Sequence, residues 1–319
     1  MMLKKILIEW KNYRRRFLPW LVCNLQHHIE PGSDQLGNGL EGTISSTEIT
    51  NCLKAMLSAF DTPCKDAKTA LKIFGADSVE RRQVFETCGK RNREILLKQF
   101  GFDLEIRKSA MPGAGKGVFV KDGKILRGQV AALYPGLIYF PHQPILFQSI
   151  RNSYIFRCAD GMYIDGNYKG LSAMLYRSIH GRDRIGSQIP ICDISWLHLH
   201  CLNEKEHECE SNSDFNRRSL NLVANPLNIG QIVNNANIKI VGHSPNLSYY
   251  EITLSFGMNE ESTFQNFFIL GLIPNAYYKG GTVDKPEQPL IVKIVALVAI
   301  KDILEGDELL ATYFTIINK

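Results

Sequence analysis

From Leu104 onward, short apolar runs are interrupted by glycine, proline or aspartate about every ten residues. Such spacing is typical of many short strands joined by turns. We expect strands over 117–120, 129–133, 163–165 and 291–300. The sequence therefore predicts a β-rich domain over residues 104–318.

The chain before this point shows a helical pattern instead. Ser46 or Thr47 is positioned to cap a helix whose apolar residues are Ile49, Leu53, Met56, Leu57 and Phe60. Helical spacing continues through Leu71, Phe74, Val84, Phe85, Ile95, Leu96 and Phe100. The expected fold class is α+β, with a basic helical N-terminal region over residues 1–100 in front of the β-rich domain.

The composition disfavours several classes of protein. The 319 residues are 45% hydrophobic and 22% charged, which is enough apolar material for a large core in one or two folding units. No apolar run reaches the ~18 residues of a membrane-spanning helix, and the start of the chain is charged where a secretory signal is apolar. Eight cysteines without a CxxC pair indicate free thiols rather than a disulfide framework or a four-cysteine zinc site. We expect an intracellular protein.

The net charge of +5 is concentrated at the N-terminus, where six basic residues within the first twenty meet the single acid Glu9. Ile6, Trp10, Phe17, Trp20 and Leu21 recur there near helical spacing, with a kink expected at Pro19. Three uses remain open: a membrane-surface or organelle-targeting helix, an anionic contact to nucleic acid or an acidic partner, and packing onto the body of the protein. Nucleus or cytoplasm is the favoured compartment, and the mitochondrion remains open. The nucleic-acid alternative is the weaker one, because no basic groove interleaved with aromatic residues recurs in the body.

A polar, charged stretch over 196–219 is expected to be a surface insertion. Its histidines and cysteines (His198, His200, Cys201, His207 and Cys209) have spacings that match no common zinc finger. We predict no metal site.

Five short clusters carry the candidate chemistry. Gly115-Lys116-Gly117 forms a glycine turn that opens into a strand, where the missing side chains let backbone amides approach a ligand. A dinucleotide fingerprint would need a third glycine and a following helix, so that class is excluded. The other clusters are Leu133-Tyr134-Pro135-Gly136, Ile164-Asp165-Gly166-Asn167, the apolar run Asn228–Val233 ending in Asn234-Asn235, and Gly306-Asp307-Glu308-Leu309 leading to Tyr313.

In this order, over about residues 104–318, the clusters resemble the SET domain of protein lysine methyltransferases. That family has an early GxGVF turn, a YxG strand end, an ID pair, an RFxNHS segment and a late GEELxxxY. The resemblance implies several small sheets, with the Asn-Asn segment threaded beneath the C-terminal strand as a pseudoknot. The helices before residue 104 would stand outside this fold.

The resemblance also implies an activity, namely transfer of a methyl group from S-adenosylmethionine to a lysine of a protein substrate. Gly115, Lys116, Gly117, Asn234, Asn235 and Tyr313 would bind the cofactor, with Asn235 at the position of the family's histidine. Tyr313 and Tyr134 would be the catalytic pair that frames the transfer. A phenol hydroxyl orients the amine, and a desolvated site beside a positive sulfonium lowers the pKa of the lysine.

Several positions depart from the family pattern. Gln231 stands in place of arginine, Ala311 and Thr312 stand in place of tyrosine and aspartate, and no cysteine-rich segment follows Tyr313. These departures motivate a rival hypothesis, in which the SET fold is a binding or scaffold protein without catalysis. Cofactor binding discriminates the two hypotheses. The substrate protein, the number of methyl groups and the oligomeric state are not specified by any residue.

Overall fold

The structure is a computed structural model and describes residues 44–63, 78–111, 113–187, 192–203, 220–236, 244–256, 269–278 and 290–316. For residues 181–187, 200–203, 290 and 313–316 it describes the backbone alone. The N-terminal basic segment and the predicted helical positions Leu71 and Phe74 lie outside the described residues.

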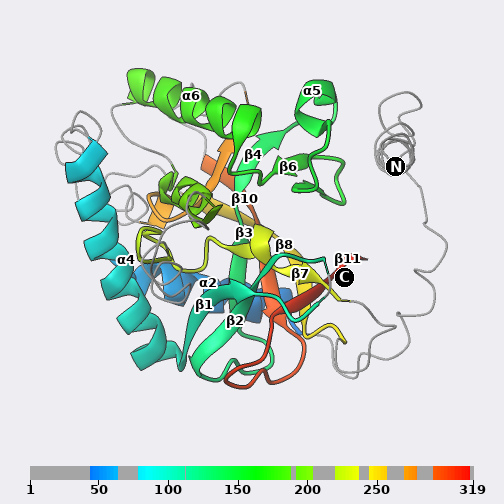
Figure 1. Cartoon of the computed structure of the whole chain (residues 1–319). Coiled ribbons are helices and arrows are strands. Elements are labelled where there is room, and N and C mark those ends of the chain that lie inside the picture. The colour runs from blue at the N-terminus through cyan, green and yellow to red at the C-terminus, as the bar shows by residue number, and fades with distance from the viewer. Residues whose placement is uncertain are drawn as a thin grey trace.

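Eleven strands form three small sheets in the described part of the chain (Figure 1). β1 (Phe102–Lys108) pairs with β2 (Lys116–Gly123). A five-stranded sheet has the order β3 (Val130–Tyr134), β10 (Leu290–Ala299), β8 (Leu247–Phe256), β11 (Leu310–Ile316) and β7 (Asn234–Asn235). A four-stranded sheet has the order β5 (Ile155–Arg157), β6 (Tyr163–Asp165), β4 (Gly136–Tyr139) and β9 (Asn275–Tyr277). The strands expected at 117–120, 129–133, 163–165 and 291–300 are confirmed within one or a few residues.

The helices are α2 (Ser46–Ala59), α4 (Ser78–Phe100), the short α5 (Leu146–Ser149) and α6 (Gly170–Ser187), with 3-10 turns η2 (Ser195–Asn203) and η3 (Gly230–Ile232). α2 begins one residue earlier than the proposed caps allow, because the Ser45 hydroxyl accepts the hydrogen bond from the Thr47 amide. The observed elements confirm a mixed α+β, β-rich fold.

The helices before residue 104 contribute to the core of the strands rather than standing outside it. Ile49, Leu53 and Met56 of α2 are fully buried and belong to one hydrophobic cluster with β3 and β10 residues. α4 is attached through a buried ion pair in which Arg93 Nη2 lies 2.6 Å from Asp103 Oδ2 at the start of β1. The boundary between an N-terminal region and a SET domain stays a prediction.

Residues 222–233 are buried throughout, and β11 lies between β8 and β7. This arrangement confirms the pseudoknot-like threading. The run before Asn234 is the turn η3 and not the expected strand. Gly230 explains the difference, because a Cβ there would lie 2.6 Å from the Leu133 carbonyl oxygen, so the chain passes too close to β3 to pair as a strand.

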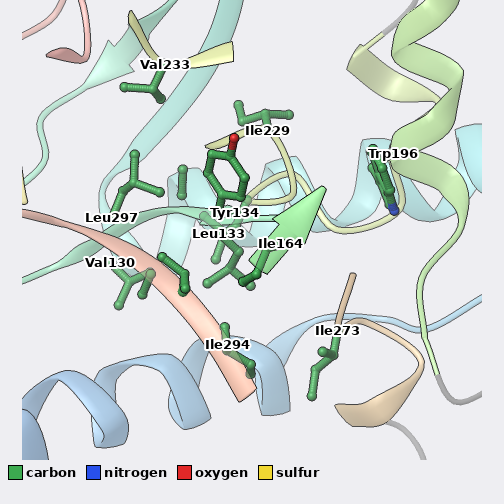
Figure 2. Packing of buried hydrophobic residues seen from close by; sticks show 14 of the residues in the cluster. Val130, Leu133, Tyr134, Ile164, Trp196, Ile229, Val233, Ile273, Ile294 and Leu297 are labelled. Atoms are coloured by element: carbon green, nitrogen blue, oxygen red, sulfur yellow. The ribbon is translucent and has the colours of Figure 1, made fainter. Parts of the chain in front are cut away.

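The stretch predicted as a surface insertion is described only to residue 203, and there Trp196, Leu197 and Leu199 are buried. Trp196 belongs to the same cluster as Tyr134 and Ile164 (Figure 2). His198 Nδ1 lies 3.0 Å from the Ser195 carbonyl oxygen, while His207 and Cys209 lie outside the described residues. Cys52, Cys88, Cys158 and Cys192, the cysteines whose side chains the structure describes, form no disulfide. Among the described helices, none is both long and apolar enough to cross a membrane.

Asp193 anchors the threaded segment. Its buried carboxylate accepts hydrogen bonds from the Ser195 amide at 2.8 Å and from Asn228 Nδ2 at 2.7 Å. Burial raises the pKa of the Asp193 carboxyl to about 6, although the hydrogen bonds from Ser195 and Asn228 oppose the rise. The folded protein therefore holds this proton more tightly than an unfolded chain, in which an aspartate has a pKa of ~4.

This shift makes stability depend on pH. The contribution of Asp193 is complete below about pH 4 and is lost as the pH rises through about 6, because the unfolded chain releases the proton first. Relative to the Asp193→Asn variant, the wild-type free energy of unfolding should fall by about 2–3 kcal/mol between pH 4 and pH 7. Urea unfolding of both proteins across this range measures the difference. The hydrogen bond that Asn228 loses in the variant adds an offset at every pH, so a difference that does not change with pH would contradict the expectation.

Candidate active site

The glycine turn lies in the hairpin between β1 and β2. The Ser109 amide donates to the Gly115 carbonyl oxygen at 2.9 Å, which closes the turn. Gly113 (φ 79°) and Gly115 (φ 76°) both adopt the left-handed conformation that favours glycine. A Cβ at either position would meet no atom within 4 Å, so this part of the backbone faces open space.

Gly117 lies against Glu308 and Asn234. A Cβ at Gly117 would lie 2.2 Å from Glu308 Oε1 and 3.0 Å from Asn234 Nδ2, so only glycine fits without displacing them. Asn234 Nδ2 donates to Glu308 Oε1 at 2.9 Å and to the Lys116 carbonyl oxygen at 3.0 Å. The Ser109 hydroxyl donates to the same carboxylate at 2.7 Å. The glycine turn, the Asn-Asn pair and the cluster that leads to Tyr313 therefore meet at Glu308.

Asn246 fixes the backbone between Glu308 and the start of β11. Its side chain accepts from the Leu310 amide and donates to the Glu308 carbonyl oxygen, both at 2.8 Å. β11 then pairs with β7 so that Leu310 faces Asn234 and Ala311 faces Asn235. Because the Asn246 side chain fixes the start of β11, Glu308 lies within hydrogen-bond distance of Asn234.

Tyr134 belongs to a second feature, the aromatic cluster formed with Phe156 and Tyr249. The ring of Tyr134 lies 5.4 Å from that of Phe156 and 6.3 Å from that of Tyr249, and Phe156 lies 4.9 Å from Tyr249. Tyr134 is only 5% exposed, and its hydroxyl donates to the Tyr154 carbonyl oxygen at 2.8 Å. The hydroxyl of Tyr134 thus has a fixed direction.

Gly166 and Gln231 lie between the two features. A Cβ at Gly166 would lie 3.0 Å from the Tyr134 ring and 3.2 Å from Gln231 Cβ, so the Ile-Asp-Gly turn packs against both. Gln231 precedes Asn234 by three residues, and it is 5% exposed. Both atoms of its amide have no hydrogen-bond partner among the described residues. The aromatic cluster and the glycine turn are therefore connected through a short stretch of chain.

The structure brings most of the proposed site residues together. Lys116 and Gly117 contact Asn234 directly, Gly115 precedes them in the turn, and Asn235 is exposed beside Asn234 on β7. Tyr134 lies in the aromatic cluster. Tyr313 lies in β11, and its side chain is outside the part of the chain that the structure describes.

The residues of the site that the sequence did not reveal include Glu308, Asn246 and Tyr249. Glu308 stood inside a recognised cluster but had no assigned role, and the Pro245-Asn246 pair before β8 gave no signal of its own. Tyr249 looked like any buried aromatic residue of an apolar strand, and only its ring contacts distinguish it.

These residues fit a cationic sulfonium ligand such as S-adenosylmethionine. Open backbone at Gly113 and Gly115 admits a ligand, and the partly buried Glu308 carboxylate is a counter-charge close by. In addition, Thr312 Oγ1, which follows Ala311 on β11, is buried without a hydrogen-bond partner among the described residues. A buried hydroxyl without a partner costs stability unless something else bonds to it.

Another polar group lies beside the aromatic cluster. Cys158, Asp160 and Glu251 offer ligand atoms within 4.8 Å of one another. The ammonium group of Lys293 bonds to Asp160 and lies 2.6 Å from Glu251, so a side-chain cation already neutralises these carboxylates. We assign no metal to this group.

The glycine turn, the Asn-Asn pair and the strand inserted between β8 and β7 together define a SET-domain protein. The chain is 31% identical over 328 residues to a human protein named SET domain-containing protein 9, covering 97% of this chain and 96% of the human one. It is 37% identical over 225 residues to the protein of the same name from Pongo abelii, covering 70% and 68%. The chain therefore belongs to the family of SET domain-containing protein 9.

Two further comparisons add little. No family model matches the sequence. The crystal structure of CpSET8 from Cryptosporidium aligns over 99% of this chain and 97% of its own, at 13% identity and a TM-score of 0.29. The family assignment rests on the sequence relatives.

Proposed function

We propose that the protein transfers a methyl group from S-adenosylmethionine to a lysine side chain of a protein substrate. The observation that carries the proposal is the meeting of Gly117, Asn234 and Glu308, which joins three distant segments beside the open backbone of Gly113 and Gly115. The bound cofactor would supply an electrophilic methyl group on its sulfonium. The residues of the chain would bind it, orient the amine and exclude water.

The glycine turn would hold the cofactor through backbone groups, because Gly113 and Gly115 present no side chain to the open space. Asn234 would position it, since its amide is already fixed by Glu308 and the Lys116 carbonyl oxygen. Asn235, exposed on β7, would offer its backbone where the family has histidine. Tyr313 would complete the cofactor site from β11.

The aromatic cluster would receive the target lysine. The Tyr134 hydroxyl donates its proton to the Tyr154 carbonyl oxygen. The phenol oxygen would then act as the acceptor of a hydrogen bond from a neutral amine. Such a bond directs the nitrogen lone pair toward the methyl donor, and orientation of this kind accounts for much of an enzymatic rate. Phe156 and Tyr249 add apolar walls that exclude water and favour the uncharged amine.

Calorimetric titration with S-adenosylmethionine tests the proposal. Asn234→Ala should weaken cofactor binding by about tenfold or more, because it removes a donor fixed at the site and leaves the Glu308 carboxylate unpaired on that side. The matched control is Asn51→Ala on the exposed face of α2, which should bind like the wild type.

Tyr134→Phe separates binding from transfer in the same experiment. It should retain cofactor affinity while lowering transfer of labelled methyl groups to proteins of a hypomethylated cell extract by about tenfold or more. No heat of binding at millimolar cofactor for the wild type would support the scaffold hypothesis and overturn the enzymatic one.

A further inference from the structure

An exposed apolar patch covers α5 and the first turns of α6. Ten large apolar side chains are exposed among the described residues, and five of them lie here: Leu146, Phe147, Ile150, Leu171 and Met174. Phe147 is 74% exposed and Met174 is 67% exposed, the two highest values of the ten. Half of these exposed apolar side chains are therefore concentrated on two neighbouring elements (Figure 1).

A buried polar network connects the two elements that carry the patch. Asn152 Nδ2 donates to the Gln148 carbonyl oxygen of α5 at 2.9 Å and to Asp165 Oδ1 at 2.8 Å. The Ser172 hydroxyl of α6 donates to the other oxygen of Asp165 at 2.5 Å. These bonds tie α5 and the start of α6 to the end of β6. Leu171 and Met174, three residues apart, share one face of α6.

The fold itself gives no reason for these exposed residues. α5 is a single turn without a side-chain cap, and its one buried residue is Ser149. Arg151, directly after Ile150, has φ 55° and is the one described residue other than glycine with a positive φ. Arg151 follows the C-cap Ile150, a position at which a left-handed residue commonly ends a helix.

The charge around the patch is positive. Lys169 and Arg177 are both exposed, each within three residues of a patch member. The stretch 136–180 contains only two acids, and neither offsets these cations: Asp165 is buried in the network, and Asp160 bonds to Lys293. Charge complementarity therefore selects an acidic partner, while the apolar side chains select apolar contacts.

We propose that the patch is a docking surface for the protein substrate, and that it takes a segment in which apolar and acidic side chains accompany the target lysine. This inference rests on the proposed function. Its position supports it, because Asp165 of the network is followed by Gly166, which packs against the Tyr134 ring. The Gly166 amide also donates to the Tyr154 carbonyl oxygen that orients the Tyr134 hydroxyl. A segment held on α5 and α6 would lie beside the aromatic cluster.

Binding of short fluorescent peptides to the full chain, measured by anisotropy without cofactor, tests the surface. One peptide set has a central lysine flanked by leucine, phenylalanine and glutamate. A second set replaces the glutamates with lysine, and a third replaces the apolar residues with serine. We expect the first set to bind about tenfold more tightly than either of the others, and to weaken as salt is raised.

The Phe147→Ser, Met174→Ser double variant should lose this preference, while Leu126→Ser, at another exposed apolar side chain, should keep it. Equal affinities for the three sets, no binding to any of them, or no effect of the double variant would overturn the proposal. A wild-type dimer in sedimentation that the double variant dissociates would show a second copy as the occupant. A cysteine introduced at Phe147 that is protected from maleimide in the free full chain would show residues 1–43 or another part of the chain as the occupant.

Calorimetry with S-adenosylmethionine keeps this proposal separate from the proposed function. The double variant should bind the cofactor like the wild type, because none of the patch residues touches Gly117, Asn234 or Glu308. Peptide preference without cofactor binding would overturn the enzymatic function alone. Cofactor binding without peptide preference would overturn the docking surface alone.

Discussion

Replacing Lys293 with methionine should lower the free energy of unfolding by about 3–5 kcal/mol, the cost of leaving buried charge without its partner. Lys293 is 6% exposed on β10, and its ammonium group bonds to both Asp160 and Glu251. Glu251, whose side chain is 9% exposed, would keep a carboxylate with no cation beside it. Methionine matches the length of the lysine stem, so the loss comes from charge and not from a cavity.

The effect should extend beyond stability, because this cluster joins two sheets. Glu251 Oε1 accepts from the Ala159 amide at 2.6 Å, and the Tyr277 hydroxyl accepts from the Lys293 amide at 2.8 Å. These bonds attach the ends of β5 and β9 to β8 and β10, next to the contact between Phe156 and Tyr249. Loosening them should loosen the aromatic cluster as well.

Urea unfolding measures the change, with Lys98→Met as the matched control. Lys98 is 74% exposed and pairs with Glu94 on α4, so its replacement should alter stability by no more than about 0.5 kcal/mol. Combining Lys293→Met with Glu251→Gln should recover part of the loss, since the second change removes the stranded charge. A Lys293→Met protein as stable as the wild type would show that the ion pairs contribute nothing net.

The second large effect is expected at Gly117, where replacement by alanine should weaken binding of S-adenosylmethionine by about tenfold or more. The new Cβ would collide with Glu308 Oε1 at 2.2 Å and contact Asn234 Nδ2 at 3.0 Å. The Glu308 carboxylate is the end of a flexible side chain and can move, but moving it breaks its hydrogen bonds with Asn234 and Ser109. The fold should survive while the geometry of the site is lost.

Gly89→Ala separates a loss of site geometry from a loss of stability. There a Cβ would lie 2.3 Å from the Asn221 carbonyl oxygen, a backbone atom that cannot rotate away, and no site residue is involved. This variant should melt at a lower temperature and still bind the cofactor when folded. The expectation for Gly117 would be wrong if Gly117→Ala lost stability like Gly89→Ala and kept normal cofactor affinity.

Local patterns in the sequence were sufficient for most of the strands. β3 and β10 are short apolar runs bounded by turns, and burial on both faces produces that pattern directly. The run before Asn234 has the same apolar composition, yet it forms η3, because the close approach of Gly230 to the Leu133 carbonyl is a contact with a distant segment. Composition cannot distinguish the two cases.

The sequence by itself determined the order of the five clusters, the glycine turn and the tyrosine at the end of β3, because each of these features is a local motif of consecutive residues. Only the tertiary structure decided that Glu308 joins Gly117 to Asn234, that Tyr249 packs edge-on against Tyr134, and that Lys293 neutralises Asp160 and Glu251. Ser109 and Glu308, for example, are 199 residues apart and share a hydrogen bond. Periodicity reports which face of a strand is buried, whereas the partner on that face is set by how the chain is threaded, and here β11 passes between two strands that precede it.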